Sequence, residues 1–516
     1  MYQRAIEERY TDGGWNGVKK EVLLNGEHLT RSEWLSVVRH RVPCKVTDEA
    51  WQKVHASRCK IEEQVQQGKI VYGVTTGFGK LSDVVIDQSD VEQLQVNLLR
   101  SHAVGVGEPF PTEVVRGMLL LRANALAKGY SGIRPQTLQL LVDLLNKGIH
   151  PVIPSQGSLG ASGDLAPLAH MALVLIGEGK AEYQGRILPG GEALRAAGLQ
   201  PVRLEAKEGL ALINGTQAMT SVGLLALSEA ERVGLAADAA LCLTMEALRG
   251  VISAFHPDLL HTRPHPEQEQ VANRVRTWLA DSRRVTRQGE LRVQDAYSLR
   301  CAPQVHGASW QAFGHVERIL EVEMNSATDN PIILPSGDIL SGGQFHGQPV
   351  AIAMDFLKIG VSEWANISER RIERLVNPQL SGLSPFLSND PGLQSGLMIV
   401  QYVAAALVSE NKVLAHPASV DSIPSSANQE DHVSMGTIAA RQLRQMVHNA
   451  VRVIAMEMIC ASQAIYLEQA ESEVSSKSRE RLAWIRSMVP PLREDASVSE
   501  EIEKLAHALL TDDVWM

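Results

Sequence analysis

Hydrophobic positions recur with the period of an α-helix over much of the second half of the chain. The clearest case is Arg441 to Tyr466, where apolar residues follow the i, i+3, i+4 spacing of one helical face. From Val453 to Ala461 nearly every face is apolar, which indicates a helix inside a bundle or at a subunit interface. Val350 to Leu375 and Leu397 to Ala415 predict two more helices, long enough to build an elongated bundle.

The first half predicts shorter elements. Val22 to Leu24 reads as a strand that enters an Asn25-Gly26 turn. Thr30 and Thr47 stand at helix N-cap positions, and the second of these helices should run to about Gln67. The other elements expected here are a helix from Thr112 to Gly129, a helix from Pro135 to Gly148 and a hairpin over Tyr183 to Leu188.

The expected fold is therefore mainly α, with a long central helical bundle and an N-terminal α-rich domain that carries a few short strands. Residues 1–20 are polar and mixed in charge and read as an N-terminal extension. The N-terminal domain is expected over 21–216, and the bundle over 217–475. A C-terminal helical tail over 476–516 follows a polar break.

Composition narrows the class of protein. The chain has 516 residues, of which 44% are hydrophobic and 21% charged, as in soluble globular proteins. A net charge of -10 disfavours nucleic acid and anionic membranes as partners, and the longest apolar run is too short to cross a bilayer. Five scattered cysteines and no metal-ligand spacing predict a cytoplasmic protein without disulfides or a metal site.

One stretch, residues 157–167, concentrates small residues: Gly-Ser-Leu-Gly-Ala-Ser-Gly-Asp-Leu-Ala-Pro. Because glycine reaches positive φ, such a stretch folds tighter than others can. In a sharp turn the Gly163 nitrogen can attack the Ala161 carbonyl carbon, and loss of water and of the Ser162 hydroxyl leaves an electrophilic ring. The plain alternative is a flexible loop; a nucleophile elbow is disfavoured because Asp164 replaces its second glycine.

A helix is expected from Asp164 to Ile176, so the Ala-Ser-Gly turn should lie at a helix N-terminus, where the dipole stabilises negative charge. Further polar stretches interrupt the apolar pattern, and buried polar groups must be satisfied or serve chemistry. They are the glycine-rich loop with Tyr72, Ser101-His102-Ala103, Asn214-Gly215-Thr216-Gln217, residues 294–301 (Gln-Asp-Ala-Tyr-Ser-Leu-Arg-Cys), residues 342–347 and Asn428-Gln429-Glu430-Asp431-His432.

Taken in order, these motifs resemble those of the aromatic amino-acid ammonia-lyases, from about residue 21 to about residue 505. The resemblance implies a mostly helical homotetramer whose active sites are assembled from three subunits. It also implies a 4-methylideneimidazol-5-one group (MIO) formed autocatalytically from Ala161, Ser162 and Gly163, with no external cofactor. One departure is Gln344, which stands where the family usually has Asn.

Carried over by position, the resemblance makes Tyr72 the base that removes a barely acidic β proton. A free tyrosine has a pKa near ~10, so this role requires a decrease of roughly 3 units. Arg300 would clamp the substrate carboxylate through a two-pronged ion pair. The remaining assignments are Tyr297 and Asn214 to orient electrophile and substrate, Gln294 and Phe345 to line the pocket, and Asp164 to assist ring formation or hold the loop.

His102 and Glu430 bear on the substrate. In the family, phenylalanine-specific pockets usually have an apolar residue and Gln at these positions, whereas two ionisable groups suit an imidazole. The expected reaction is therefore elimination of ammonia from L-histidine to give trans-urocanate, the first step of histidine degradation. A phenol can also bond His102, so tyrosine ammonia-lyase and tyrosine 2,3-aminomutase are the alternatives; a non-catalytic helical scaffold is a third.

Overall fold

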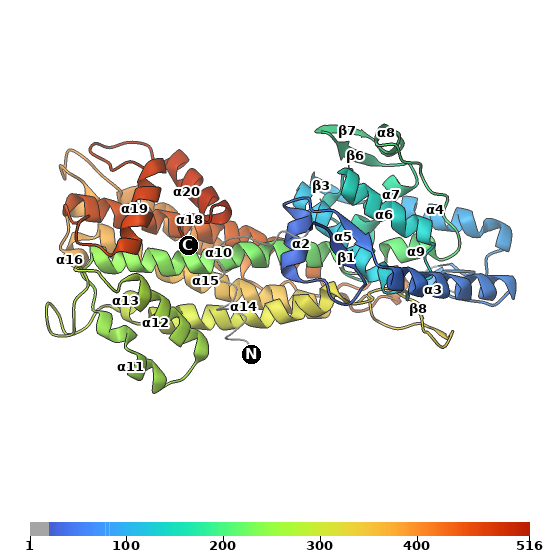
Figure 1. Ribbon diagram of the computed structural model, residues 1–516, viewed down its shortest axis with the longest axis horizontal. Helices are drawn as coiled ribbons and strands as arrows, with labels where there is room; N and C mark the ends of the chain where they lie inside the picture. The colour runs from blue at the N-terminus through green and yellow to red at the C-terminus, as the bar shows by residue number, and fades with distance from the viewer. Residues whose placement is uncertain (1–19, 78, 82) are drawn as a thin grey trace. The chain divides into compact units, whose positions relative to one another are not determined.

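The computed structural model describes residues 20–77, 79–81 and 83–516, and it is mainly helical, as the sequence predicted (Figure 1). Its contacts divide the chain into two compact units. The first unit contains residues up to Val222, Leu320–Ala351 and Ser419–Ile438, and the second contains Gly223–Ile319, Ile352–Ala418 and Ala439–Met516.

These units differ from the boundaries expected from the sequence. Residues 320–351 and 419–438, which were expected in the bundle, belong to the first unit, and the expected tail over 476–516 belongs to the second. The expected extension over 1–20 lies, apart from Lys20, outside the described residues. Four long helices each contain a boundary between the two units, so each unit is made of separate stretches of the chain. Hydrophobic periodicity predicts such a helix but not the residue at which it passes from one unit to the other.

The first unit joins helices with four small sheets, ordered β1-β2, β3-β5, β4-β6-β7 and β8-β9. The β1-β2 pair is parallel and the other pairs are antiparallel. Its elements are β1 (Val22–Leu24), α2 (Arg31–Val38), β2 (Cys44–Val46), α3 (Asp48–Gln66), α4 (Val91–His102), β3 (Val106–Pro109), α5 (Thr112–Ala127), α6 (Pro135–Lys147), β4 (His150–Pro151), β5 (Pro154–Gln156), α7 (Leu165–Leu175), β6 (Lys180–Tyr183), β7 (Arg186–Pro189), α8 (Gly190–Ala196), α9 (Glu208–Ile213), β8 (Ile332–Ile333) and β9 (Ile339–Leu340).

The second unit is built from helices. Four of them continue from the first unit: α10 (Gln217–Ala247), α14 (Ala302–Met324), α15 (Gln348–Val376) and α18 (Gly436–Leu467). The others are α11 (Pro257–His261), α12 (Pro266–Trp278), α13 (Tyr297–Arg300), α16 (Pro378–Ser381), α17 (Met398–Leu414), α19 (Ser476–Met488) and α20 (Ser499–Thr511).

Local sequence signals explain most helix ends. Thr30 caps α2 in a capping box, in which its hydroxyl accepts from the Glu33 backbone and its own backbone N–H donates to the Glu33 carboxylate. Thr47 caps α3 as expected, and Gly148 ends α6 with a φ of 71°. The helix expected from Thr112 begins there as α5, but Thr112 is its first residue and not its cap: the cap position is Pro111, and the Thr112 hydroxyl donates to Glu182 at 3.1 Å.

Helix α18 contains the predicted Arg441 to Tyr466 stripe and extends it at both ends. It is long and apolar enough to cross a membrane by length and composition, but 83% of its most apolar window is buried inside the protein. It is therefore a core helix, and its apolar faces serve packing.

A buried ion pair anchors α15 and α18 within the second unit. Arg371 donates to both carboxylate oxygens of Glu457, at 2.6 and 2.8 Å, and both side chains are inaccessible to solvent. Thr244 and Ser368 donate to the same carboxylate at 2.7 and 2.6 Å. With its lone pairs satisfied in this way, the charge is tolerated in an apolar interior.

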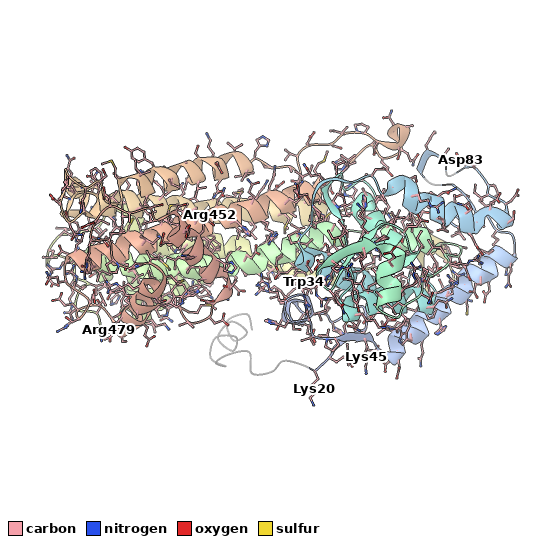
Figure 2. The ribbon with its side chains drawn as sticks, turned by 90° about the horizontal axis from the view of Figure 1, so that it is seen from above. Lys20, Trp34, Lys45, Asp83, Arg452 and Arg479 are labelled. Atoms are coloured by element: carbon pink, nitrogen blue, oxygen red, sulfur yellow. The ribbon has the colours of Figure 1, made fainter. Side chains whose placement is uncertain are left out.

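Arg371→Met should destabilise the protein by about 3–5 kcal/mol, because it leaves the Glu457 carboxylate buried without a countercharge. Arg452→Met is the matched control: Arg452 lies on α18 and forms a two-pronged pair with Glu503 of α20, where both side chains are partly exposed (Figure 2). A pair of that kind contributes about 0–1 kcal/mol. Urea unfolding followed by circular dichroism measures the free energy of unfolding of both variants, and equal losses of stability would contradict the expectation.

Candidate active site

Residues of the first unit line a partly open cavity of about 770 Å³. Its wall combines the Tyr72 segment, the C-terminal half of α4, the start of α7, α9 and three loops. The predicted site residues that line it are Tyr72, His102, Ser162, Asn214, Phe345 and Glu430. Residues from six distant parts of the chain therefore meet around one space.

The Ala161-Ser162-Gly163 turn is pressed against the end of α9. Gly163 has a φ of +75° and forms a parallel bridge with Gly215, and a Cβ at Gly163 would overlap the Gly215 carbonyl oxygen. The next amide, that of Asp164, donates to the same oxygen at 2.7 Å. The Asn214 side-chain amide donates to the Ser162 carbonyl at 2.8 Å. Only glycine fits at position 163. The hydrogen bonds at the Gly215 and Ser162 carbonyls hold the peptide groups of the turn in place.

Asp164 holds the turn from behind. Its carboxylate is fully buried and accepts from the Ser158 hydroxyl at 2.8 Å, the Met219 backbone N–H at 2.9 Å and the Thr437 hydroxyl. Burial raises the pKa of Asp164, and these hydrogen bonds oppose that increase. The carboxylate does not cap α7, which begins at Leu165; it joins the turn to α10 and α18.

Tyr72 lines the cavity next to an anchored segment. Its hydroxyl accepts from the Gly79 backbone N–H at 3.1 Å, and Val74, two residues on, is fully buried in a cluster with Ile61. Burial raises the pKa of Tyr72, the Glu430 charge raises it further, and the Gly79 N–H works against both. This increase in the Tyr72 pKa is opposite to the decrease that a base at neutral pH requires, so the environment of the cavity does not by itself activate the phenol.

His102 ends α4, beside Ser101. The Ser101 hydroxyl donates to the Leu98 carbonyl at 3.1 Å and lies 3.0 Å from His102 Nδ1. With the single hydroxyl proton directed to Leu98, the matching tautomer of the neutral imidazole carries its proton on Nδ1, toward Ser101, and leaves Nε2 as an acceptor. Burial lowers the pKa of His102, while the Leu98 carbonyl and Glu430 raise it. The ring is therefore favoured in its neutral form.

Glu430 contacts the turn directly. One carboxylate oxygen accepts from the Ser162 hydroxyl at 3.0 Å, and the other accepts from the Ser425 hydroxyl at 3.0 Å. The Ser425 backbone N–H also donates to the Glu430 carbonyl at 2.9 Å, which closes the loop that carries this carboxylate. The sequence placed Glu430 in the pocket; its bond to Ser162 was not foreseen.

Three predicted site residues lie outside the first unit and its cavity. Gln294, Tyr297 and Arg300 belong to the second unit. The Arg300 guanidinium lies over the Tyr297 ring, 4.6 Å from its centroid, and Tyr297 is 69% exposed. The structure of one chain therefore supplies no arginine for a substrate carboxylate among the residues that line this cavity.

Other polar residues of the lining, including Asn97 and Asn330, were not predicted from the sequence, and Gln429 stood in a predicted motif without a role of its own. The Asn330 side-chain oxygen accepts from the Gly342 backbone at 2.8 Å and so shapes the rim. A polar segment that ends in Asn330-Pro331 signals a turn, but nothing local places that turn at the cavity. Among the described residues, no group of three or more His, Cys, Asp or Glu side chains is arranged to hold a metal ion.

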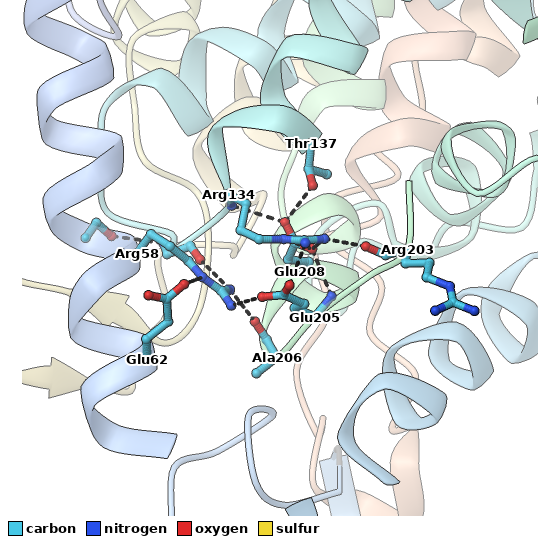
Figure 3. A network of polar contacts seen from close by, with 10 residues as sticks. Arg58, Glu62, Arg134, Thr137, Arg203, Glu205, Ala206 and Glu208 are labelled. Carbon is cyan, nitrogen blue, oxygen red and sulfur yellow. Dashed lines mark hydrogen bonds and ion pairs between the residues drawn. The ribbon is translucent and has the colours of Figure 1, made fainter. Parts of the chain in front are cut away.

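Buried ions fix the start of α9, the helix that leads to Asn214. The Glu208 carboxylate, inaccessible to solvent, accepts from the Arg134 guanidinium at 2.6 Å and the Thr137 hydroxyl at 2.6 Å (Figure 3). Arg134 also binds Glu205, at 2.6 Å, and Glu205 binds Arg58 at 2.6 Å. These bonds join α3, α6 and α9 in one network.

The end of α9 is held by Arg122. Its guanidinium is almost inaccessible to solvent and donates to the Asn214 carbonyl at 2.9 Å, to the Gln217 side chain at 3.1 Å and to the Ala211 carbonyl. Burial lowers the pKa of Arg122 to about 10, which leaves it charged at neutral pH. A cation on the last carbonyls of a helix is favourable, and here it fixes the backbone of Asn214.

Comparison with known proteins agrees with this fold. The aromatic amino acid lyase family profile matches residues 29–487, and the chain belongs to this family. A relative named histidine ammonia-lyase, from Bacillus cytotoxicus, is 58% identical over 95% of this chain and 97% of its own. The crystal structure of histidine ammonia-lyase from Trypanosoma cruzi has a TM-score of 0.89 at 44% identity, covering 96% of this chain and 94% of its own. Tyrosine aminomutase from Streptomyces globisporus has a TM-score of 0.93 at 38% identity, covering 96% and 97%.

Glu430→Gln should lower the pKa of His102 further, because the Glu430 charge favours the imidazolium. Asp431→Asn, which removes the adjacent exposed carboxylate, is the control and should change the His102 pKa less. Titration of histidine-labelled protein by NMR, with His102 assigned through His102→Gln, measures the effect. An increase in the pKa in Glu430→Gln would contradict the electrostatic reading of the cavity.

Proposed function

We propose that this chain eliminates ammonia from L-histidine to give trans-urocanate. The observation that carries the proposal is the meeting of three features around one cavity: the strained Ala161–Gly163 turn, the His102 imidazole and the Glu430 carboxylate. The turn offers an electrophile, and the two polar groups offer partners for an imidazole. A structural scaffold has no need of a buried, ionisable cavity around a glycine-only turn.

The electrophile of the aromatic amino acid lyases is MIO, and the residues present here fit it. Ring closure joins the Gly163 nitrogen to the Ala161 carbonyl carbon, and the positive φ of Gly163 and its close approach to Gly215 favour such a bend. The Asn214 amide and the Asp164 network hold the peptides on either side. When formed, the group supplies an electron-poor centre that engages the substrate at its amine or its ring.

Tyr72 is proposed as the base that removes the β proton. Because burial and Glu430 raise its pKa, the phenol needs an added positive charge near it in the assembled site. The guanidinium of Arg300 is the proposed source, and the same group would bind the substrate carboxylate through a two-pronged ion pair. Asn214 would orient the electrophile, and Phe345 would pack on the substrate.

The choice of histidine rests on hydrogen bonding. His102, neutral with Nδ1 bonded to Ser101, presents an acceptor for an imidazole N–H, and the Glu430 carboxylate presents another. A phenyl ring would leave both unpaired, which costs more than a missing apolar contact. The relative that is 58% identical is named a histidine ammonia-lyase, while the tyrosine aminomutase is 38% identical, and this supports histidine over tyrosine.

A homotetramer with shared active sites is proposed to supply Gln294, Tyr297 and Arg300 from neighbouring copies. Apolar side chains lie exposed along helices of the second unit: Ile352, Phe356 and Ile359 repeat along one face of α15 at 53%, 43% and 54% exposure. Apolar stripes of this kind mark protein interfaces.

The free state of all five cysteines is in keeping with the proposed cytoplasmic location.

Purified protein should have a mass two water molecules below that of the encoded chain. Ultraviolet absorbance should report turnover of histidine about 100-fold or more faster than that of phenylalanine, because the polar site rejects an apolar ring. Gly163→Ala should show the full encoded mass and no turnover, since the turn cannot form. Faster turnover of tyrosine than of histidine would contradict the substrate, and a full mass in active wild-type protein would contradict the electrophile.

Variants in the two units should complement each other if sites are shared between copies. Tyr72→Phe and Arg300→Met should each lose nearly all activity when purified alone. Assembled together from equal amounts, they should regain activity, since about a quarter of sites would combine an intact Tyr72 with an intact Arg300. Lack of recovery in mixed assemblies, verified by mass, would place both residues in one chain's site.

A further inference from the structure

A buried amide connects the Tyr72 segment to α9. Gln95 lies on α4 and is inaccessible to solvent. Its side-chain oxygen accepts from the Gly209 backbone N–H at 2.9 Å and the Leu210 backbone N–H at 3.4 Å. Its side-chain nitrogen donates to the Gly73 carbonyl at 3.4 Å. One amide thus contacts both the residue after Tyr72 and the helix that leads to Asn214.

The orientation of this amide is set by its partners. The Gly209 and Leu210 N–H groups lie in the first turn of α9, where backbone donors have no partner within the helix. Only the oxygen of Gln95 can accept from them, so the NH₂ group must face the Gly73 carbonyl. Reversing the amide would oppose donor to donor and acceptor to acceptor in a buried place, where an unpaired polar group is costly.

Close packing brings α9 against α4 at the Gln95 amide. A Cβ at Gly209 would lie 2.8 Å from the Gln95 backbone oxygen and 3.0 Å from its side-chain oxygen. Only glycine therefore permits α9 to approach α4 at this point. With Arg122 holding the last carbonyls of α9 and Gln95 its first amides, the helix is fixed at both ends.

We propose that Gln95 is a positioning residue, which sets the Tyr72 phenol relative to the Ala161–Gly163 turn. The connection runs from Gly73 through the Gln95 amide to Gly209, along α9, and through the Asn214 amide to the Ser162 carbonyl. Reaction geometry depends on such placement, because a displacement of about 1 Å can cost on the order of 100-fold in rate. The proposal rests on the assignment of Tyr72 as the base.

Gln95→Met keeps the length of the side chain and removes both sets of hydrogen bonds. It should lower kcat by roughly 10- to 100-fold with little change in KM, because substrate contacts remain while the base is misplaced. The mass deficit of two waters should persist, since the turn is held independently by Asp164. Gln139→Met is the control: Gln139 lies exposed on α6, where its side-chain nitrogen donates to Asp143 at 2.8 Å, and the substitution should leave kcat unchanged.

Hydrogen exchange separates this role from a general loss of stability and does not depend on the substrate. Gln95→Met should speed exchange in the segment 71–77 and at Gly209 and Leu210. Gln95→Glu keeps an acceptor for α9 and, when ionised, has no donor for Gly73, so it should speed exchange in 71–77 while the α9 amides stay slow. Either variant alone reports on exchange in 71–77, so this part of the measurement stands if the other variant folds poorly.

Unchanged kcat and unchanged exchange in 71–77 in both variants would overturn the proposal. Loss of the mass deficit together with activity would also overturn it, because Gln95 would then serve the formation of the turn. If wild-type protein fails to turn over histidine, tyrosine or phenylalanine, the proposed function fails, whereas the exchange experiment still decides whether Gln95 couples the two segments.

Discussion

The contact between the backbones of Gly163 and Gly215 is the constraint on which the site depends. With no side chain on either residue, the turn after Ala161 lies against the end of α9, and the Asp164 amide donates to the Gly215 carbonyl. This closeness holds Gly163 at positive φ, where other residues are strained. A larger residue at either position would separate the turn from Asn214, and the remaining cavity residues would surround an ordinary loop.

Buried charges and amides keep that contact in place. Arg122 binds the carbonyls at the end of α9, and Glu208 with Arg134 binds its start. Six-residue helices have little stability of their own, so α9 depends on these tertiary bonds for its position. Ion pairs of this kind contribute little net stability compared with apolar packing, but each has a single satisfied arrangement, and a cavity that must align several groups benefits from that specificity.

The electrostatics of the cavity are the reason that the proposed sharing of sites between copies would matter. Within the first unit, burial and Glu430 raise the pKa of Tyr72, and burial lowers that of His102. A neutral histidine suits recognition of an imidazole. A phenol with a raised pKa, however, provides little phenolate at neutral pH and is therefore a poor base there. The positive charge that would correct this, on Arg300, belongs to the second unit. Separation of base and cation along the chain explains why assembly would matter to activity.

Sequence by itself determined the elements whose causes are local: the Thr30 capping box, the Gly148 helix end, the α18 stripe and the glycine-rich turn at 161–163. Polar motifs that stand out from an apolar helical background, together with the family resemblance that they carry, also named six of the residues that line the cavity. Only the tertiary structure decided the discontinuous units, the bond from Glu430 to Ser162, the direction of the Tyr72 pKa and the Gln95 link. Those properties depend on burial and on partners far away in the sequence, such as Ser162 and Glu430, which are 268 residues apart, and the chain carries no periodic signal for such pairs.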